Sequence, residues 1–225
     1  MGFFSKWFGA DKSSNSSDSA NHPVNTAAIE RLNQLNRQDM ITLDNGFGLP
    51  PMVRGQTLML EDVYCDEYQY RLEAVYWFKT KQDQTLRLVE HKDKLLLCLP
   101  LTRAQVEQIF DLDEFSYLFD IDSHAALTPL TTAFASDVSA WLGQQYHRVR
   151  FAEFGYRHQQ DYRQRTPPQS DDRQGGQAFE SYYLETSDEQ HALLIQVMTS
   201  GDTDVYLAMA RPMTDIHEFW PRGNP

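Results

Sequence analysis

The stretch Tyr68-Gln-Tyr-Arg-Leu-Glu-Ala-Val-Tyr-Trp-Phe78 alternates between two kinds of side chain. One set of alternate positions is apolar and consists of Tyr68, Tyr70, Leu72, Ala74, Tyr76 and Phe78. Polar residues fall between them, at Gln69, Arg71 and Glu73. A period of two that is rich in aromatic residues predicts a β-strand with one buried face.

Similar patterns predict more strands on both sides of this stretch. A first strand is expected over 57–60, and others over 85–91, 94–99, 148–156, 179–185, 191–198 and 204–210, with a turn at Lys92-Asp93. Apolar residues at helical spacing predict helices over 26–37, 131–142 and 215–220. A further helix is expected to open at Thr102, because Thr102 and Gln105 have the spacing of a capping box.

The two halves of the chain align with each other at a shift of 107 residues (183 − 76 = 107), which places Tyr76 on Tyr183 and Leu86 on Leu193. A duplication explains this match, but so does the general likeness of any two β-meanders. Short connections between strands favour antiparallel pairing. We therefore expect an α+β fold of two related antiparallel halves, each a β-meander plus a helix, with a flexible N-terminal tether.

The first residues form a separate segment. Its aromatic side chains would share one face of a helix, and they are Phe3, Phe4, Trp7 and Phe8. Residues 10–24 are rich in Ser, Asn and Asp, which is typical of a flexible tether. We expect an aromatic segment with its tether over 1–24, a helix and linker over 25–54, and the two halves over 55–145 and 146–225. The alternative is one globular domain over 25–225.

Charge and motifs exclude several classes of protein. The chain has 20 Lys and Arg against 32 Asp and Glu, and this net charge of −12 disfavours nucleic-acid binding. Residues 104–147 hold seven acidic residues and no Lys or Arg, so this face is expected to bind a basic protein partner. The two cysteines, Cys65 and Cys98, lack zinc-site spacing, and no nucleotide-binding motif is present. No cofactor is expected.

One cluster has the composition of a metal site. Asp120, Asp122 and His124 would share a face of an extended strand, and three such side chains can hold a divalent cation. An acidic loop after a helix is the alternative interpretation. A second candidate site is a ligand pocket between the two halves, lined by the aromatic residues Tyr70, Tyr76, Tyr183 and Tyr206. The alternative there is an ordinary core.

Both ends of the chain resemble a group of uncharacterised bacterial proteins. The resemblance rests on the opening Met-Gly-Phe-Phe-Ser-Lys-Trp-Phe-Gly of residues 1–9, and on Phe179-Glu-Ser-Tyr-Tyr-Leu, Leu193-Leu-Ile-Gln-Val, Asp204-Val-Tyr-Leu, Arg211-Pro and Asp215-Ile. Some members of that group accompany phage-shock-protein-A-like envelope-stress proteins. The resemblance implies a cytoplasmic accessory protein near the inner membrane, and not an enzyme.

These observations lead to two hypotheses for the function. The first is a non-enzymatic cytoplasmic interaction protein, which binds a protein partner or the surface of a membrane through Phe3, Phe4, Trp7 and Phe8. The second is a small metal-dependent hydrolase centred on Asp120, Asp122 and His124.

Overall fold

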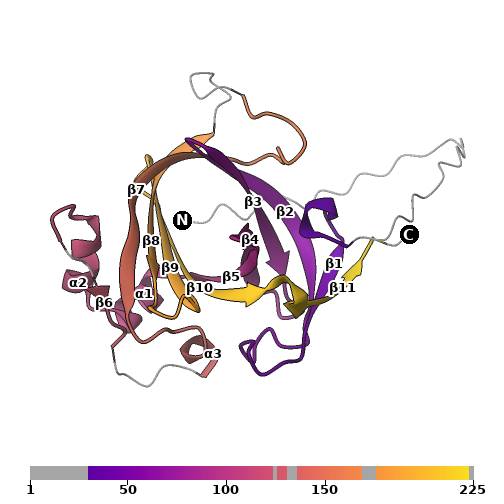
Figure 1. The fold of residues 1–225 in the computed structure, drawn as a ribbon, viewed down its shortest axis with the longest axis horizontal. Coiled ribbons are helices and arrows are strands. Elements are labelled where there is room, and N and C mark those ends of the chain that lie inside the picture. The colour runs from indigo at the N-terminus through magenta and orange to yellow at the C-terminus, as the bar shows by residue number, and fades with distance from the viewer. Residues whose placement is uncertain (1–29, 124–125, 131–135, 169–175, 223–225) are drawn as a thin grey trace, which may run out of the picture.

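A computed structural model describes residues 30–123, 126–130, 136–168 and 176–222. Eight of its strands close into an antiparallel β-barrel (Figure 1). The first four are β2 (Thr57–Tyr68), β3 (Arg71–Lys79), β4 (Thr85–His91) and β5 (Lys94–Leu101). The second four are β7 (Tyr146–His158), β8 (Gln177–Glu185), β9 (His191–Met198) and β10 (Thr203–Pro212).

Two seams close the ring. β5 pairs with β10, from Leu101 opposite Val205 to Lys94 opposite Pro212. β2 pairs with β7, where Tyr68 lies opposite Gly155. Three short strands extend the sheet beyond the ring: β1 (Met40–Leu43) on β2, β11 (Ile216–Trp220) on β1, and β6 (Ala126–Leu127) on β7.

The helices are short and lie outside the ring. They are α1 (Arg103–Ile109), α2 (Leu112–Ser116) and α3 (Ser136–Ser139), with 3-10 turns η1 (Leu32–Gln34), η2 (Tyr117–Phe119) and η3 (Met213–Asp215). α1 begins as the sequence predicts, because Thr102 and Gln105 form a complete capping box.

The α+β prediction is wrong. Of the residues that the structure describes, strands hold 49% and helices 13%, and this part of the molecule is mainly a closed barrel. The predicted meanders do not form two separate layers with a helix on each. Instead, the two outer strands of one meander pair with the two outer strands of the other. The backbone hydrogen bonds at the edges of both meanders are therefore made within one ring.

The predicted helices account for most of the local errors. Residues 215–220 form the end of η3 and the strand β11, because pairing with β1 overrides the helical spacing of Ile216 and Phe219. Within 26–37 the described part holds only η1, and within 131–142 it holds only α3. The stretch 68–78 contains a turn at Gln69-Tyr70 and is therefore a strand only from Arg71.

The barrel interior is identified by contacts between strands that are not neighbours. Arg87 on β4 bonds Gln196 on β9, and Trp77 on β3 packs against Tyr206 on β10 with ring centroids 6.2 Å apart. The same face holds a small apolar cluster that includes Val75 and Leu194. A larger cluster covers the outer face, where residues such as Leu88, Leu97 and Leu207 are buried beneath the connections and short helices.

Candidate functional site

The wall of the barrel opens between β3 and β4. These two strands pair only from Val75 opposite Val89 to Lys79 opposite Thr85. The first residues of β3 therefore bond to β2 alone. On the far side of the opening, the turn between β4 and β5 places Lys92 and Asp93 at positive φ angles of 51° and 61°.

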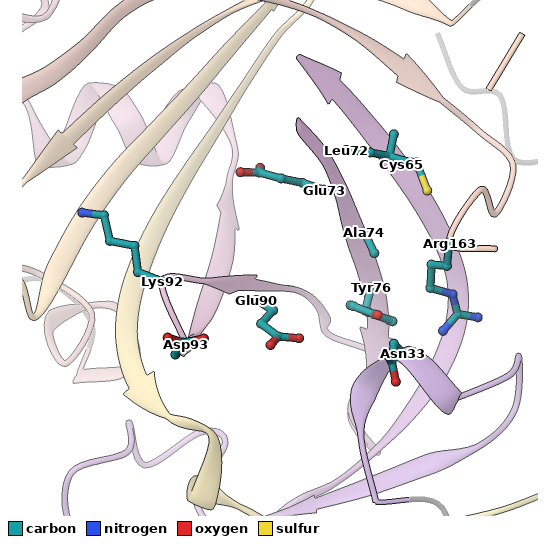
Figure 2. A pocket seen from close by; sticks show the side chains of 10 residues that line it. All are labelled: Asn33, Cys65, Leu72, Glu73, Ala74, Tyr76, Glu90, Lys92, Asp93 and Arg163. Carbon is teal, nitrogen blue, oxygen red and sulfur yellow. The ribbon is translucent and has the colours of Figure 1, made fainter. Parts of the chain in front are cut away.

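A pocket of about 460 Å³ occupies this opening (Figure 2). Ala74 and Tyr76 line it from β3, and Glu90, Lys92 and Asp93 line it from β4 and the following turn. Asn33 of η1 and Arg163, which follows β7, complete the wall. Cys65 of β2 also lines it, so segments from five parts of the chain meet at one hollow of a size that suits a small ligand or a few side chains.

Each of the two cations that line the pocket has a carboxylate near it. Arg163 makes an ion pair with Asp161 at 2.7 Å and donates to the carbonyl oxygens of Leu32 and Leu35 at 3.3 and 2.8 Å. These bonds fix η1 against the barrel. Burial opposes the ionisation of Asp161, but the hydrogen bonds from Arg163 outweigh it and lower the pKa of Asp161. Lys92 lies 3.8 Å from a carboxylate oxygen of Glu185.

The carboxylates of the pocket are not all paired. Glu73 accepts a hydrogen bond of 2.7 Å from Arg71, which also bonds Glu153. Glu90 and Asp93 are exposed, and neither side chain makes a hydrogen bond or ion pair with the residues that the structure describes. The side chains of this pocket that have no partner among the described residues are therefore carboxylates, and Lys92 has only the 3.8 Å contact with Glu185.

Two more hollows adjoin the first. A hollow of about 440 Å³ shares Asn33 and Glu90 with it and extends between η1 and β11, where Met213, Ile216 and Phe219 line it. A hollow of about 360 Å³ shares Arg163 and lies on the other side. We call the first two, joined at Asn33 and Glu90, the rim groove.

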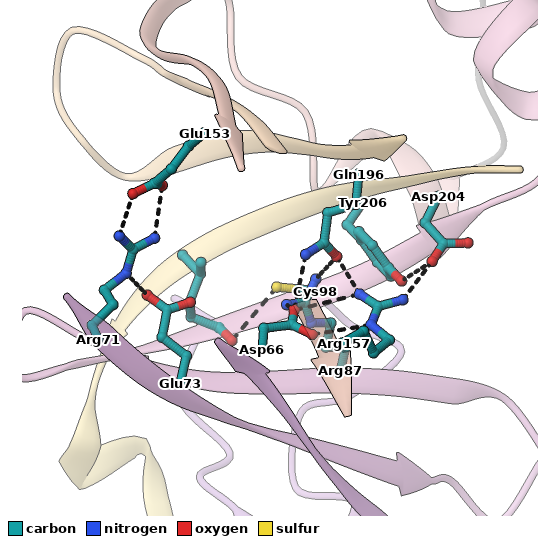
Figure 3. A network of polar contacts seen from close by, with 11 residues as sticks. Asp66, Arg71, Glu73, Arg87, Cys98, Glu153, Arg157, Gln196, Asp204 and Tyr206 are labelled. Atoms are coloured by element: carbon teal, nitrogen blue, oxygen red, sulfur yellow. Dashed lines mark hydrogen bonds and ion pairs between the residues drawn. The ribbon is translucent and has the colours of Figure 1, made fainter. Parts of the chain in front are cut away.

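A buried polar network braces the inside of the barrel (Figure 3). Arg87 and Arg157 each donate to the carboxylate of Asp66 at 3.0 Å, and Gln196 donates to it at 2.8 Å. Burial alone would raise the pKa of Asp66, but Arg157 and Arg87 outweigh it and lower that pKa. The outer end of the network is Asp204, which accepts from Arg157 at 2.8 Å. The network joins five strands of the barrel.

The four tyrosines of the predicted ligand pocket do not converge. Tyr70 is exposed in the turn between β2 and β3, and Tyr76 is buried on the outer face beneath Arg163. Tyr183 and Tyr206 lie inside the barrel, beside Arg150 and Arg87 respectively. Of the four, only Tyr76 lines the pocket in the barrel wall.

The predicted metal trio is described only in part. Asp120 and Asp122 lie in an exposed loop, in which the Asp120 carboxylate accepts the backbone N–H of Asp122 at 3.0 Å. His124 lies outside the described residues. Among the residues that are described, no three His, Cys, Asp or Glu side chains are grouped as a metal site requires. The trio with His124 stays a prediction.

The N-terminal aromatic segment, with Phe3, Phe4, Trp7 and Phe8, and its tether also lie outside the described residues. Within the described part of the chain, no helix has the length and apolar character needed to cross a membrane. Comparison of the chain with protein-family models, with curated proteins and with solved structures finds no match.

Sequence reasoning missed the rim groove. Glu90 and Asp93 are ordinary surface residues in the sequence, and only the short pairing between β3 and β4 brings them to a cavity. The sequence signal nearest to it was the predicted turn at Lys92-Asp93, which the structure confirms.

Proposed function

We propose that this protein is a non-enzymatic binding protein, and that its rim groove receives a cationic group of a protein partner. The observation that carries the proposal is the pairing state of the charges in the pocket. In the first pocket Arg163 is held by Asp161 and Lys92 lies 3.8 Å from Glu185, whereas Glu90 and Asp93 have no partner among the described residues. The second hollow adds Glu30 and Arg31, which are both exposed and opposite in charge, so Glu90 and Asp93 remain the excess charge of the groove. A lysine or arginine side chain would supply the missing charge.

The chemistry of the surroundings supports a binding role. The walls are held in place by Arg163 on one side and by the β4–β5 turn on the other, so the pocket is preorganised. The net charge of −12 attracts basic partners from a distance and repels acidic ones. The proposal retains the basic protein partner that the sequence predicts. It places the binding site for that partner in the rim groove and not on residues 104–147.

A binding titration tests the proposal. Fluorescence anisotropy would follow the binding of a fluorescein-labelled lysine-rich peptide to the full chain at low salt. The double variant Glu90→Gln, Asp93→Asn is expected to weaken binding severalfold, because it removes two exposed ion pairs that each contribute roughly 0.2–1 kcal/mol at low salt.

The matched control is the double variant Asp113→Asn, Glu114→Gln, which removes the same two charges from the exposed surface of α2. It is expected to change affinity by less than about twofold, since distant surface charges are screened. Equal losses in the two double variants would show that the peptide responds only to the net charge of the molecule, and the proposal would be wrong.

A further inference from the structure

The sheet ends at β11. Its neighbour on one side is β1, in a register that runs from Met40 opposite Trp220 to Leu43 opposite Ile216. On its other side, no strand of the described chain pairs with it. A strand at the edge of a sheet presents unpaired backbone N–H and C=O groups, which are a template for an added strand.

The two faces of β11 differ in character. Ile216 and Phe219 point toward the core and line the part of the rim groove between η1 and β11. Trp220 lies on the opposite face, beside Met40, which in turn lies opposite Met59 of β2. These three side chains are 45%, 37% and 41% exposed and form an apolar stripe that reaches the edge of the sheet.

A strand added to this edge would present alternate side chains to these two surfaces, because side chains on one face of a strand repeat every two residues, roughly 6.6 Å apart. On the groove side, long basic side chains would lay their stems over Ile216 and Phe219 and reach Glu90 with their charged ends. On the other side, apolar side chains would cover Trp220 and Met40.

We infer that the partner is an extended segment with alternating basic and apolar residues, which adds to the free edge of β11 and places its basic residues in the rim groove. This inference rests on the proposed function and specifies the form of the ligand. A second copy of this chain fits the edge less well, because two molecules of net charge −12 repel each other and Glu218 would add to that repulsion.

The test compares three probes on the full chain: the heptapeptide Lys-Val-Lys-Val-Lys-Val-Lys, the same peptide methylated on every second backbone nitrogen, and spermine. The unmodified peptide is expected to bind at least about tenfold more tightly than the methylated one, because methylation removes the strand hydrogen bonds and keeps the charge. Hydrogen exchange of the β11 amides is expected to slow with the unmodified peptide and to be unchanged by spermine.

Two variants locate the contact. Trp220→Ala is expected to weaken binding of the unmodified peptide severalfold, whereas Phe154→Ala, which removes an exposed aromatic ring from β7, is expected to leave it unchanged. Far-UV circular dichroism of both variants would confirm that they are folded.

Different results would contradict the proposed function and the inference of strand addition. If both peptides bind equally and both lose affinity in the Glu90→Gln, Asp93→Asn variant, the groove binds cations but strand addition is wrong. If that variant binds both peptides like the native chain, the proposed function itself is wrong. Slow exchange in the free protein of the β11 amides that point away from β1, at any protein concentration, would show that the edge is already covered and would also overturn the inference.

Discussion

Arg87 on β4 donates a hydrogen bond of 2.9 Å to Gln196 on β9, although β5 and β10 separate their strands around the ring. The bond therefore crosses the interior of the barrel. Both residues also contact Asp66 on β2, so one carboxylate holds three strands together. Removing this charge should affect the whole barrel and not one local contact.

The first prediction concerns that carboxylate. Asp66→Asn leaves Arg87 buried without a counter-charge and leaves Arg157 with Asp204 alone, and it is expected to lower the free energy of unfolding by about 3–5 kcal/mol. Urea unfolding at pH 7 measures the change. The control is Asp83→Asn, which breaks the exposed pair with Lys79 and should cost less than about 1 kcal/mol. Similar losses in both variants would show that the network does not brace the barrel.

The second prediction concerns the pH dependence of stability and rests on the same carboxylate, Asp66. The pKa of Asp66 in the folded protein lies below its ordinary value of 3.8. As the pH falls past that ordinary value, the unfolded chain takes up the proton first, so the folded state loses stability. The native chain should therefore show a steeper fall of the urea midpoint below about pH 4 than Asp66→Asn does. Parallel curves for the two proteins would contradict it.

The third prediction concerns the seam between β2 and β7. A Cβ atom on Gly155 would lie 2.7 Å from the Phe179 ring and 2.8 Å from the backbone oxygen of Glu67. Gly155→Ala is therefore expected to destabilise the protein by about 1–3 kcal/mol, as overpacking does elsewhere. Gly46→Ala is the control, because its nearest neighbour is the movable carboxylate of Asp44 at 3.2 Å. Thermal unfolding compares the two.

The fourth prediction concerns the start of α1. Thr102→Ala removes the side-chain oxygen that accepts from the backbone N–H of Gln105 and is expected to cost about 1 kcal/mol. Thr102→Ser keeps the hydroxyl and should keep nearly all of the stability. Chemical denaturation of both variants separates the cap from the loss of a methyl group. An equal loss with serine would assign the effect to packing.

The fifth prediction concerns the two thiols. Cys98 is buried in the barrel interior, and burial raises its pKa to about 12; burial also raises the pKa of Cys65. Because the thiolate is the reactive form, neither cysteine should react with Ellman's reagent in the folded protein. Both should react after unfolding in guanidinium chloride. Rapid labelling of one thiol in the native state would show that its surroundings open.

The strands could be predicted from the sequence because their alternation is a local property. The closure of the ring could not, since the pairing of β2 with β7 joins residues such as Asp66 and Arg157, which are 91 positions apart. The last predicted helix failed for a related reason. The spacing of Ile216 and Phe219 suits a helix, and only the contact with β1 selects a strand.

The predicted tyrosine pocket does not form, because Tyr76 and Tyr183 lie on opposite faces of the sheet. Tyr76 faces outward on β3, whereas Tyr183 faces inward on β8 and its neighbour Tyr182 faces outward. In a strand, a shift of one residue moves a side chain to the other face of the sheet. The alignment of the two halves placed Tyr76 on Tyr183, so it paired residues of opposite orientation.

The two seams also govern how the chain can be made in a cell. The strands β2 to β5 end at Leu101. The partner of β2, β7, begins at Tyr146, 45 residues later (146 − 101 = 45), and the partner of β5, β10, begins only at Thr203. At translation rates of about 5–20 residues per second, roughly 2–9 seconds pass between the end of the first meander and the start of β7, and for this time β5 and the part of β2 beyond β1 lack their partners. During this interval the free edges of the meander can pair with strands of other nascent chains.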